Sequence, residues 1–460
     1  MKAKKIIVIG GVASGPAAVA EARRTDSEAD ITIVEMGPDI SYSACEMPLY
    51  VSGEIANSER LVRYAVAKFK EQFSSTVFTH HEVERIDVQK RVVMVRDLTT
   101  QHERALSYDK LILATGSGAV VPEALQSSSR DVHILRSLQD ARSIVDTLDP
   151  RTIHHAVIVG SGFVGLDVVE SLLHRGIRVT MLASEGRVLK GSLDADMSAL
   201  VVDHLEQKGV SVRNERATSL DVAPDGSIRA VLTDIGEKIG CGFVLIAAGT
   251  RPLTELGIQA GLKTGESGAY EVDSQLRTSV PGIWACGDCI EKKDAVTGKS
   301  IRAPLALNAF RSGRVAGRNA ARSGKGRPAQ LGPIVMATAI SASGLEVAHT
   351  GWSVEEAQSA GLAAVGETIT HRSASSLANH HPLCVRLVAD PSSGKLLGAQ
   401  IIGLQGAAQR INIITALLRT GATVDDLYNV DFVYSPRLAP AHDAMMIAAR
   451  MMQKRLIGKR

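Results

Sequence analysis

The sequence predicts an α/β fold with two similar parallel-sheet units and a separate α+β domain at the C-terminal end. The segments Lys4–Glu35 and His155–Leu182 each run from a β-branched stretch through a Gly-rich turn and a helical pattern into a second β-branched stretch. The 460 residues suggest about three domains at roughly 150 residues each. Beyond the linker-like segment Arg322–Pro328, the pattern mixes short strands with helices. Those strands are expected at Cys384–Ala389 and Ala399–Gly403, and the helices at Gln409–Arg419 and Ala441–Arg450.

The composition excludes several classes of function. Lys and Arg total 52 and Asp and Glu total 49, so a net charge of +3 gives no electrostatic case for binding nucleic acid or an anionic membrane. No stretch reaches the roughly 18 apolar residues of a membrane-spanning helix. The five Cys are an odd number and too few for a disulfide framework, which favours a reducing, cytoplasmic location.

The first Gly-rich turn suits the pyrophosphate of a dinucleotide, because glycine allows close approach to backbone N–H groups at a helix N-terminus. Glu35 ends the next strand, 25 residues after Gly10, where a carboxylate can accept hydrogen bonds from a ribose. Val12 stands where the strict pattern has a second glycine, so an ordinary βαβ turn is the alternative. The residues expected to bind the cofactor are Gly10, Gly11, Val12, Ala13, Gly15 and Glu35.

The second Gly-rich turn matches the dinucleotide fingerprint in full. Ala183 stands 23 residues after the first glycine of this turn, where an acidic residue would favour NADH. Its absence favours NADPH, or the use of both coenzymes. Ser184 and Arg187 are candidates to contact a 2′-phosphate, although Glu185 lies between them and Arg187 is alternatively a solvated turn charge. The fingerprint glycines are Gly160, Gly162 and Gly165.

The order of the motifs resembles the single-cysteine branch of the pyridine nucleotide-disulfide oxidoreductase family. This branch includes coenzyme A disulfide reductases, NADH oxidases and peroxidases, and polysulfide reductases. The resemblance covers essentially the whole chain and is carried by SYSACEMPLY (Ser41–Tyr50), ATG (Ala114–Gly116), AAGTRP (Ala247–Pro252), TSVPGIWACGDC (Thr278–Cys289) and DFVYSPRLAPAHDAMMIAA (Asp431–Ala449).

The resemblance implies an FAD-dependent NAD(P)H oxidoreductase that forms a homodimer. Residues 1–117 would begin an FAD-binding domain, 118–245 would bind NADPH or NADH, 246–325 would return to the FAD domain, and 330–460 would form the dimerisation domain. Beyond the two Gly-rich turns, the resemblance assigns further cofactor contacts to Ala114, Thr115, Gly116, Gly249, Gly287 and Asp288.

Cys45 is the candidate redox residue, the alternative being a small buried hydrophobe. No neighbouring Cys can pair with it, so its chemistry would pass through a mixed disulfide, a persulfide or a sulfenic acid. Because the thiolate is the attacking form, we expect a lowered pKa, helped by a helix that begins just after Cys45. The family resemblance further implies that Tyr434 serves the substrate thiol.

The substrate class implied by the resemblance is a low-molecular-weight disulfide, persulfide or polysulfide. The oxidases and peroxidases typically carry a His in the first Gly-rich turn, and Gly10–Ala18 has none. A sulfenic-acid NADH oxidase or peroxidase and a redox-sensing flavoprotein remain alternatives. Glu46, after the redox Cys, and the His pair before Pro382 depart from the family pattern. Candidate substrate contacts are Arg23, Ser41, Tyr42, Arg63, His380 and His381.

Some of these candidates have structural alternatives. Arg23 would instead be a cation facing a helix C-terminus, Tyr42 would pack, and the His pair would belong to a solvated loop. Cys286 and Cys289 have the spacing of a redox or metal pair, but they bracket the flavin-associated Asp288 and lack two further ligands. We therefore expect them to pack in the core, with no metal site.

Overall fold

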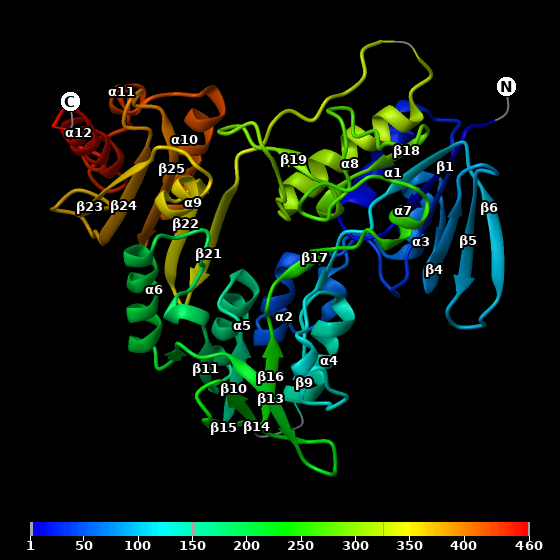
Figure 1. Cartoon of the computed structure of the whole chain (residues 1–460), viewed down its shortest axis with the longest axis horizontal. Coiled ribbons are helices and arrows are strands. Elements are labelled where there is room, and N and C mark those ends of the chain that lie inside the picture. The colour runs from blue at the N-terminus through cyan, green and yellow to red at the C-terminus, as the bar shows by residue number, and fades with distance from the viewer. Residues whose placement is uncertain (1–2, 150–152, 325, 459–460) are drawn as a thin grey trace.

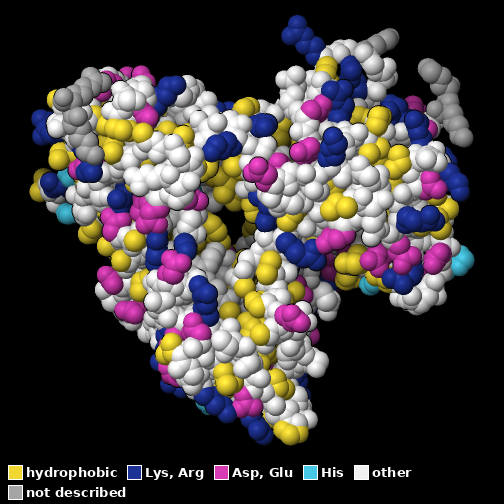
Figure 2. All heavy atoms as spheres, viewed as in Figure 1, with side chains coloured by type: hydrophobic (Ala, Val, Ile, Leu, Met, Phe, Trp, Pro, Cys, Tyr) yellow, Lys and Arg dark blue, Asp and Glu magenta, His cyan; other side chains and the backbone are white. Residues whose placement is uncertain are grey.

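The computed structural model describes residues 3–149, 153–324 and 326–458, arranged as three lobes (Figure 1). The predicted fold class is confirmed: two units contain parallel sheets, and a C-terminal domain combines an antiparallel sheet with helices. The domain boundaries predicted from the sequence stay a proposal, and residues 1, 325 and 460 among them lie outside the described ranges. Figure 2 shows the surface hollowed where the three lobes meet.

The first parallel sheet forms from short apolar runs that are buried on both faces. Its order is β18-β7-β1-β2-β3, so the return segment of the chain supplies an edge strand. Its strands are β1 (Lys5–Ile9), β2 (Asp30–Val34), β3 (Thr76–Phe78), β7 (Lys110–Leu113) and β18 (Ile283–Ala285), with helices α1 (Ser14–Thr25), α3 (Val66–Phe73), α7 (Glu255–Gln259) and α8 (Ala306–Ala321) and an antiparallel sheet of β4 (His81–Asp87), β5 (Val92–Asp97) and β6 (Glu103–Ser107).

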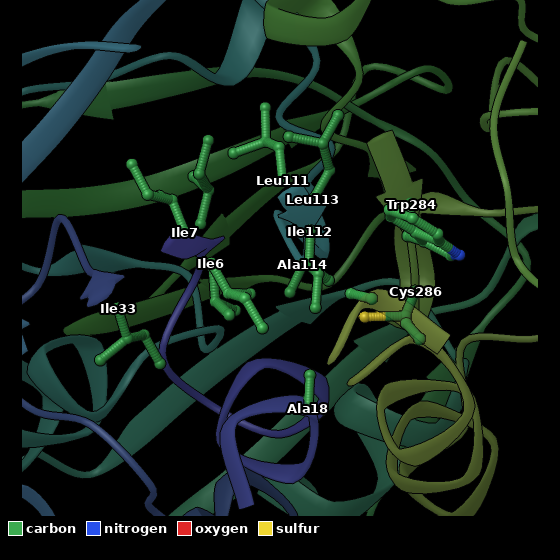
Figure 3. Packing of buried hydrophobic residues seen from close by; sticks show 14 of the residues in the cluster. Ile6, Ile7, Ala18, Ile33, Leu111, Ile112, Leu113, Ala114, Trp284 and Cys286 are labelled. Carbon is green, nitrogen blue, oxygen red and sulfur yellow. The ribbon is translucent and has the colours of Figure 1, made fainter. Parts of the chain in front are cut away.

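Helices α1 and α8 pack with their backbones in close approach. A Cβ on Gly313 would lie 2.2 Å from the Ser14 carbonyl oxygen, and one on Gly317 would lie 2.1 Å from that of Ala18. Ala18 also faces the core of the sheet, where side chains of β1, β2, β7 and β18 meet (Figure 3). This packing holds the start of α1 at the carboxyl ends of the strands.

The second parallel sheet repeats the arrangement in the order β12-β11-β10-β16-β9. Strands β10 and β11 pair in parallel from His155 and Arg178 to Val159 and Leu182. The elements are β9 (Val132–His133), β10 (His155–Val159), β11 (Arg178–Leu182), β12 (Ser211–Arg213) and β16 (Phe243–Ile246), with α4 (Leu138–Leu148), α5 (Phe163–His174) and α6 (Ala195–Gln207), and an antiparallel sheet of β13 (Ala217–Val222), β14 (Ile228–Thr233) and β15 (Lys238–Gly240).

Two chain crossings connect these units. Strand β8 (Ser117–Ala119) leaves the first unit and pairs antiparallel with β17 (Thr250–Pro252), which returns to it. Both crossings leave the carboxyl end of a central strand, so they pass beside the Gly-rich turns. Smaller elements are α2 (Met47–Ser52), β19 (Lys292–Lys293), β20 (Ser300–Ile301) and the 3₁₀ turns η1 (Ala44–Glu46), η2 (Ser58–Leu61), η3 (Glu123–Leu125), η4 (Ser184–Gly186) and η5 (Gly287–Cys289).

The C-terminal domain is an antiparallel sheet, in the order β21-β22-β25-β24-β23, that packs against helices. Strands β24 and β25 supply most of the core residues that come from the sheet, and all eight residues of β25 are buried. The elements are β21 (Ala337–Ala342), β22 (Leu345–Gly351), β23 (Val365–Arg372), β24 (Pro382–Ala389), β25 (Leu396–Gly403), α9 (Val354–Ser359), α10 (Ala407–Thr420), α11 (Val424–Tyr428) and α12 (Ala444–Ile457).

Candidate active site

At two positions, Gly10 and Gly15, the backbone of the first Gly-rich turn leaves no room for any residue but glycine. Gly10 has φ +107° and donates its N–H to the Val34 oxygen at 2.8 Å. A Cβ on Gly10 would lie 2.2 Å from the Ala114 oxygen, and one on Gly15 would lie 1.8 Å from the Gly10 oxygen. The turn therefore brings backbone and the start of α1 together without side chains between them. That cradle fits a pyrophosphate.

Glu35 follows β2 and lies directly beside this turn. Its two carboxylate oxygens accept the N–H groups of Gly11 at 2.6 Å and of Gly37 at 2.7 Å. Burial raises the pKa of Glu35, and these hydrogen bonds act in the opposite direction. The carboxylate thus lies where a ribose diol of the bound dinucleotide would need acceptors.

The return segment brings Asp288 to the same edge of the sheet. Gly287 has φ +88°, donates its N–H to Ser312 Oγ at 3.0 Å and leaves room for Ser14, whose Oγ would be 2.5 Å from a Cβ there. Asp288 Oδ2 accepts hydrogen bonds from Ser117 Oγ at 3.1 Å and from Arg136 Nη2 at 3.2 Å. The predicted Asp288 therefore lies over the start of α1, together with two polar residues that the sequence analysis did not name.

The two crossings hold the other predicted residues of this site. The Ala114 N–H donates to the Ile9 oxygen at 2.8 Å, and Thr115 Oγ1 donates to the Leu253 oxygen at 2.6 Å. Gly116 and Gly249 have φ of +71° and +114°, which glycine adopts without strain. The hydrogen bond from Thr115 to Leu253 joins the two chain crossings.

Cys45 lies close to the first Gly-rich turn. The Ser41 N–H donates to the Gly11 oxygen at 2.7 Å, and the Arg63 N–H donates to the Ser41 oxygen at 2.8 Å. Tyr42 forms a bridge with Val62, so the segment before Cys45 is held on both sides. The structure therefore brings Ser41, Tyr42 and Arg63 together near the exposed Cys45.

The prediction of a lowered Cys45 pKa is wrong. Burial under neighbouring atoms raises the pKa of the thiol first, although the side chain still reaches solvent. The carboxylates of Asp167, Asp288 and Glu46 raise it further, and only Arg136 lowers it. The expected helix is present, but α2 has six residues and does not reverse this balance.

Asp167 and Arg136 are functional candidates that the sequence analysis missed. Asp167 lies on α5, one turn before Ser171, whose Oγ donates to the Pro48 oxygen of α2 at 2.8 Å. Burial, followed by the charge of Glu170, raises the Asp167 pKa to about 7. Asp167 follows the third fingerprint glycine by two residues, and that position is the one sequence signal that pointed to it.

The second Gly-rich turn repeats the geometry of the first. Gly160 has φ +112°, and its Cβ would lie 2.3 Å from the Ala247 oxygen. A Cβ on Gly165 would lie 2.4 Å from the Gly160 oxygen, whereas one on Gly162 would meet nothing within 4 Å. The residues fit a second dinucleotide.

The segment after β11 determines the charges at the ribose end of this second site. Ser184 is exposed, and Glu185 pairs with Lys190. The Arg187 side chain is only 16% exposed, so the alternative of a solvated turn charge is wrong. Its Nη1 donates to Glu355 Oε2 at 2.7 Å, and its Nη2 donates to the Leu193 oxygen at 2.8 Å.

Arg23 has a structural set of partners. Its Nε donates to the Phe73 oxygen at 2.9 Å and its Nη2 to the Ser74 oxygen at 2.8 Å, while Nη1 donates to the Ser27 oxygen. The guanidinium thereby ties the end of α1 to the end of α3. All three guanidinium nitrogens of Arg23 have protein acceptors, which favours a structural role over a contact to the substrate.

Tyr434, His380 and His381 lie on the C-terminal domain. The loops that hold them are tied together by the Ser375 N–H, which donates to the Pro436 oxygen at 3.2 Å. Tyr434 is 60% exposed, and His380 is also exposed. Figure 1 separates β23 and β24, which flank the His loop, from α2 beside Cys45. In the described parts of one chain, no hydrogen bond joins these loops to the Cys45 segment.

Cys286 and Cys289 are fully buried beside the first sheet, where Cys286 lies among apolar side chains (Figure 3). Cys289 Sγ is 3.2 Å from the Cys286 oxygen. Within residues 3–149, 153–324 and 326–458, no group of three or more His, Cys, Asp and Glu is placed to hold a metal ion. Over the same ranges, no helix combines the length and apolar character of a membrane span.

The chain has two Gly-rich turns that each fit a dinucleotide, and the paired strands β8 and β17 connect the units that hold them. An exposed Cys lies beside the first turn. These features define an oxidoreductase that binds two dinucleotides. A family model described as pyridine nucleotide-disulphide oxidoreductase matches residues 4–313, and the model of that family's dimerisation domain matches residues 338–445. The chain belongs to this family. The family uses FAD with NADH or NADPH, and both cradles fit these cofactors.

Similar proteins cover nearly the whole chain. A relative from Pyrococcus furiosus, named NAD(P)H sulfur oxidoreductase (CoA-dependent), is 30% identical over 98% of this chain and 100% of its own length. One from Methanocaldococcus jannaschii, named NADH oxidase, is 28% identical over 99% of this chain and 100% of its own. The solved structure of an NAD-dependent persulfide reductase from A. fulgidus has a TM-score of 0.94 and 30% identity, covering 99% of this chain and 84% of that one.

Proposed function

We propose that this protein is an FAD-dependent NAD(P)H reductase of a low-molecular-weight disulfide, persulfide or polysulfide, with Cys45 as its redox residue. The observation that carries the proposal is the position of Cys45 between the two cofactor cradles. Ser41 ties its segment to Gly11 of the first cradle, and Asp167 acts on the thiol from α5 of the second. The names of the relatives from Pyrococcus furiosus and A. fulgidus support a sulfur substrate.

The reaction balances with one redox Cys. The Cys45 thiolate attacks one sulfur of RSSR′, forms a Cys45–S–S–R bond and releases R′S⁻. Two electrons then break that bond and return the Cys45 thiolate with RS⁻. FAD, when bound, passes these electrons on from NAD(P)H. The sum is RSSR′ + NAD(P)H + H⁺ → RSH + R′SH + NAD(P)⁺.

The protein's own residues divide the remaining work. Arg136 is the cation that favours the Cys45 thiolate, and it also holds Asp288 through a hydrogen bond at 3.2 Å. Ser41, Tyr42 and Arg63 belong to the segments that hold Cys45 beside the first Gly-rich turn, and they would contact the substrate. Tyr434 would donate a proton to the released R′S⁻ across a dimer interface.

A second copy of the chain is the partner that this arrangement requires. Large apolar side chains are exposed around Tyr434: Leu377 is 97%, Leu438 78% and Val433 81% exposed. They lie in the region matched by the dimerisation model. Covering them with a second copy would carry Tyr434, His380 and His381 towards the partner's Cys45.

An NADH oxidase is the second candidate, and the name of the Methanocaldococcus jannaschii relative favours it. In that case Cys45 would cycle through a sulfenic acid. The segment Gly10–Ala18 contains no His to assist such an intermediate. We therefore rank this activity below sulfur reduction.

Anaerobic oxidation of NADPH or NADH with coenzyme A disulfide or polysulfide as the sole acceptor tests the proposal. We expect two thiols per NADPH with the disulfide, and at least a 100-fold loss of turnover in Cys45→Ser with flavin reduction by NADPH retained. Cys384→Ser, in β24, is the matched control and should keep its activity. Full activity of Cys45→Ser would refute the role of this residue. Fast aerobic turnover to water without sulfur reduction would support the oxidase.

A further inference from the structure

Both cations on the turn after β11 are paired with a carboxylate, but the two carboxylates come from different domains. Lys190 pairs with Glu185 of the same turn, and both side chains are about half exposed. Arg187 pairs with Glu355, which lies 168 residues further along the chain on α9 of the C-terminal domain. The Arg187 side chain is 16% exposed and that of Glu355 is 49% exposed, so the shielded partner is the arginine.

Arg187 is anchored against the second Gly-rich turn itself. Ser161, between the first two fingerprint glycines, donates its Oγ to the Arg187 oxygen at 2.8 Å. The Leu189 N–H donates to the Ser161 oxygen at 2.9 Å. The guanidinium Nε has no acceptor among the described residues. The backbone of Arg187 therefore lies beside the second Gly-rich turn, and its guanidinium keeps one buried N–H without a partner in the described parts of the chain.

Glu355 is held in place from both sides of the domain contact. Its Oε1 accepts the Ala195 N–H at 3.2 Å, while its own N–H donates to Asp194 Oδ1 at 3.1 Å. Asp194 is buried and accepts a further hydrogen bond from Gln400 Nε2 at 2.8 Å. The carboxylate that faces Arg187 is thus positioned by the packing of the C-terminal domain on the second unit.

We propose that Glu355 is a specificity-determining residue that weakens the binding of NADPH relative to NADH. A 2′-phosphate carries close to two negative charges at neutral pH. It would meet a guanidinium that Glu355 already neutralises, and it would lie near the Glu355 carboxylate itself. NADH lacks the phosphate and does not require Arg187. Because Glu355 belongs to another domain, coenzyme choice depends on the domain contact as well as on the turn.

Nucleotide binding to the oxidised, FAD-loaded protein tests this inference without turnover. The probes are 2′,5′-ADP, which carries the additional phosphate, and 5′-AMP, which does not, with both dissociation constants measured by calorimetry. For Glu355→Gln we expect the affinity for 2′,5′-ADP relative to 5′-AMP to rise roughly threefold to tenfold. The measurement needs neither Cys45 nor a sulfur substrate, so its outcome is independent of the proposed function.

Three controls separate charge from structure. Glu367→Gln removes a carboxylate of the same domain that pairs with Arg455 at 3.0 Å, and it should leave the ratio unchanged. Arg187→Gln should lower the ratio, and combining it with Glu355→Gln should abolish the gain. A lower ratio in Glu355→Gln would mean that the carboxylate orients Arg187 towards the phosphate, which overturns the inference. An equal change for both probes would indicate only a structural effect, and it too would overturn the inference.

Discussion

The two nucleotide cradles of this chain share a backbone and differ at the ribose end. Gly10 and Gly160 have φ of +107° and +112°, and each donates its N–H to the last residue of the neighbouring strand, at 2.8 and 3.0 Å. The residue after that strand is Glu35 in the first cradle and Ala183 in the second. Both donate their N–H to the next strand of the sheet in the same way, at 2.8 and 2.9 Å. Their side chains are therefore at equivalent positions.

The shared backbone and the differing side chains face two different parts of the nucleotide, the pyrophosphate and the ribose. The backbone shape serves the pyrophosphate, which both dinucleotides contain, so it is repeated. The side chain after the strand meets a ribose, which differs between FAD, NADH and NADPH, so it varies. In the first cradle the carboxylate proposed to select the ribose, Glu35, comes from the βαβ unit itself, whereas after the second cradle the shielded Arg187 pairs with Glu355 of another domain.

The largest effect should come from adding a methyl group to the shared backbone. Gly10→Ala would place its Cβ 2.2 Å from a carbonyl oxygen, and Gly160→Ala would do so at 2.3 Å, both at positive φ. We expect Gly10→Ala to lose bound flavin, and Gly160→Ala to keep flavin but lose coenzyme binding by about 100-fold. Visible absorbance measures the first and coenzyme titration the second. Gly242→Ala is the control, since Gly242 lies outside both Gly-rich turns and the nearest atom to its Cβ would be Ile153 Cγ2 at 3.6 Å, an ordinary contact distance. Equal loss of flavin in both variants would contradict the separate assignment of the cradles.

A smaller change should make the second cradle resemble the first. Ala183→Glu introduces the carboxylate that Glu35 supplies in the first cradle. We expect it to weaken NADPH binding about tenfold or more while NADH binding is retained, because the carboxylate repels a 2′-phosphate and accepts a 2′-hydroxyl. Coenzyme titration of the oxidised protein measures both. Ala183→Gln, of similar size without charge, should change NADPH binding much less; if both variants lose NADPH equally, steric crowding at this buried position is the cause.

Local units were predictable from the sequence, and long-range contacts were not. Gly10, Gly15 and Glu35 lie within one short βαβ segment, so spacing alone located them together. In the same way, the strands expected at Cys384–Ala389 and Ala399–Gly403 are present as β24 and β25. The last helix begins later than expected, at Ala444, because the Asp443 side chain accepts the Met445 N–H and caps it.

The charges around Cys45 show why the rest of the site escaped prediction. They come from Glu46 beside it in the sequence, but also from Arg136, Asp167 and Asp288, which are far away along the chain. The need for a thiolate, and a helix after Cys45, pointed to a lowered pKa, whereas tertiary packing brought two more carboxylates, Asp167 and Asp288, to the thiol beside Glu46. In the same way, the shielding of Arg187 depends on Glu355, and no local pattern links the two.

The smallest expected effect concerns Asp167, which lies on α5 of the second unit and acts on Cys45 beside the first Gly-rich turn. Its pKa of about 7 lies well above the ordinary carboxyl value, so its charge appears as pH rises through neutrality. That charge raises the Cys45 pKa. Removing it in Asp167→Asn should therefore increase the alkylation rate of Cys45 roughly twofold to fivefold above pH 7. Below pH 6, where Asp167 of the wild-type protein is protonated, the difference should fade. Iodoacetamide rates against pH measure this, with Cys45→Ser as the blank. Arg136→Gln should shift the rate in the opposite direction, since its cation lowers the same pKa. A rate ratio independent of pH would mean that Asp167 acts on Cys45 through packing and not through charge.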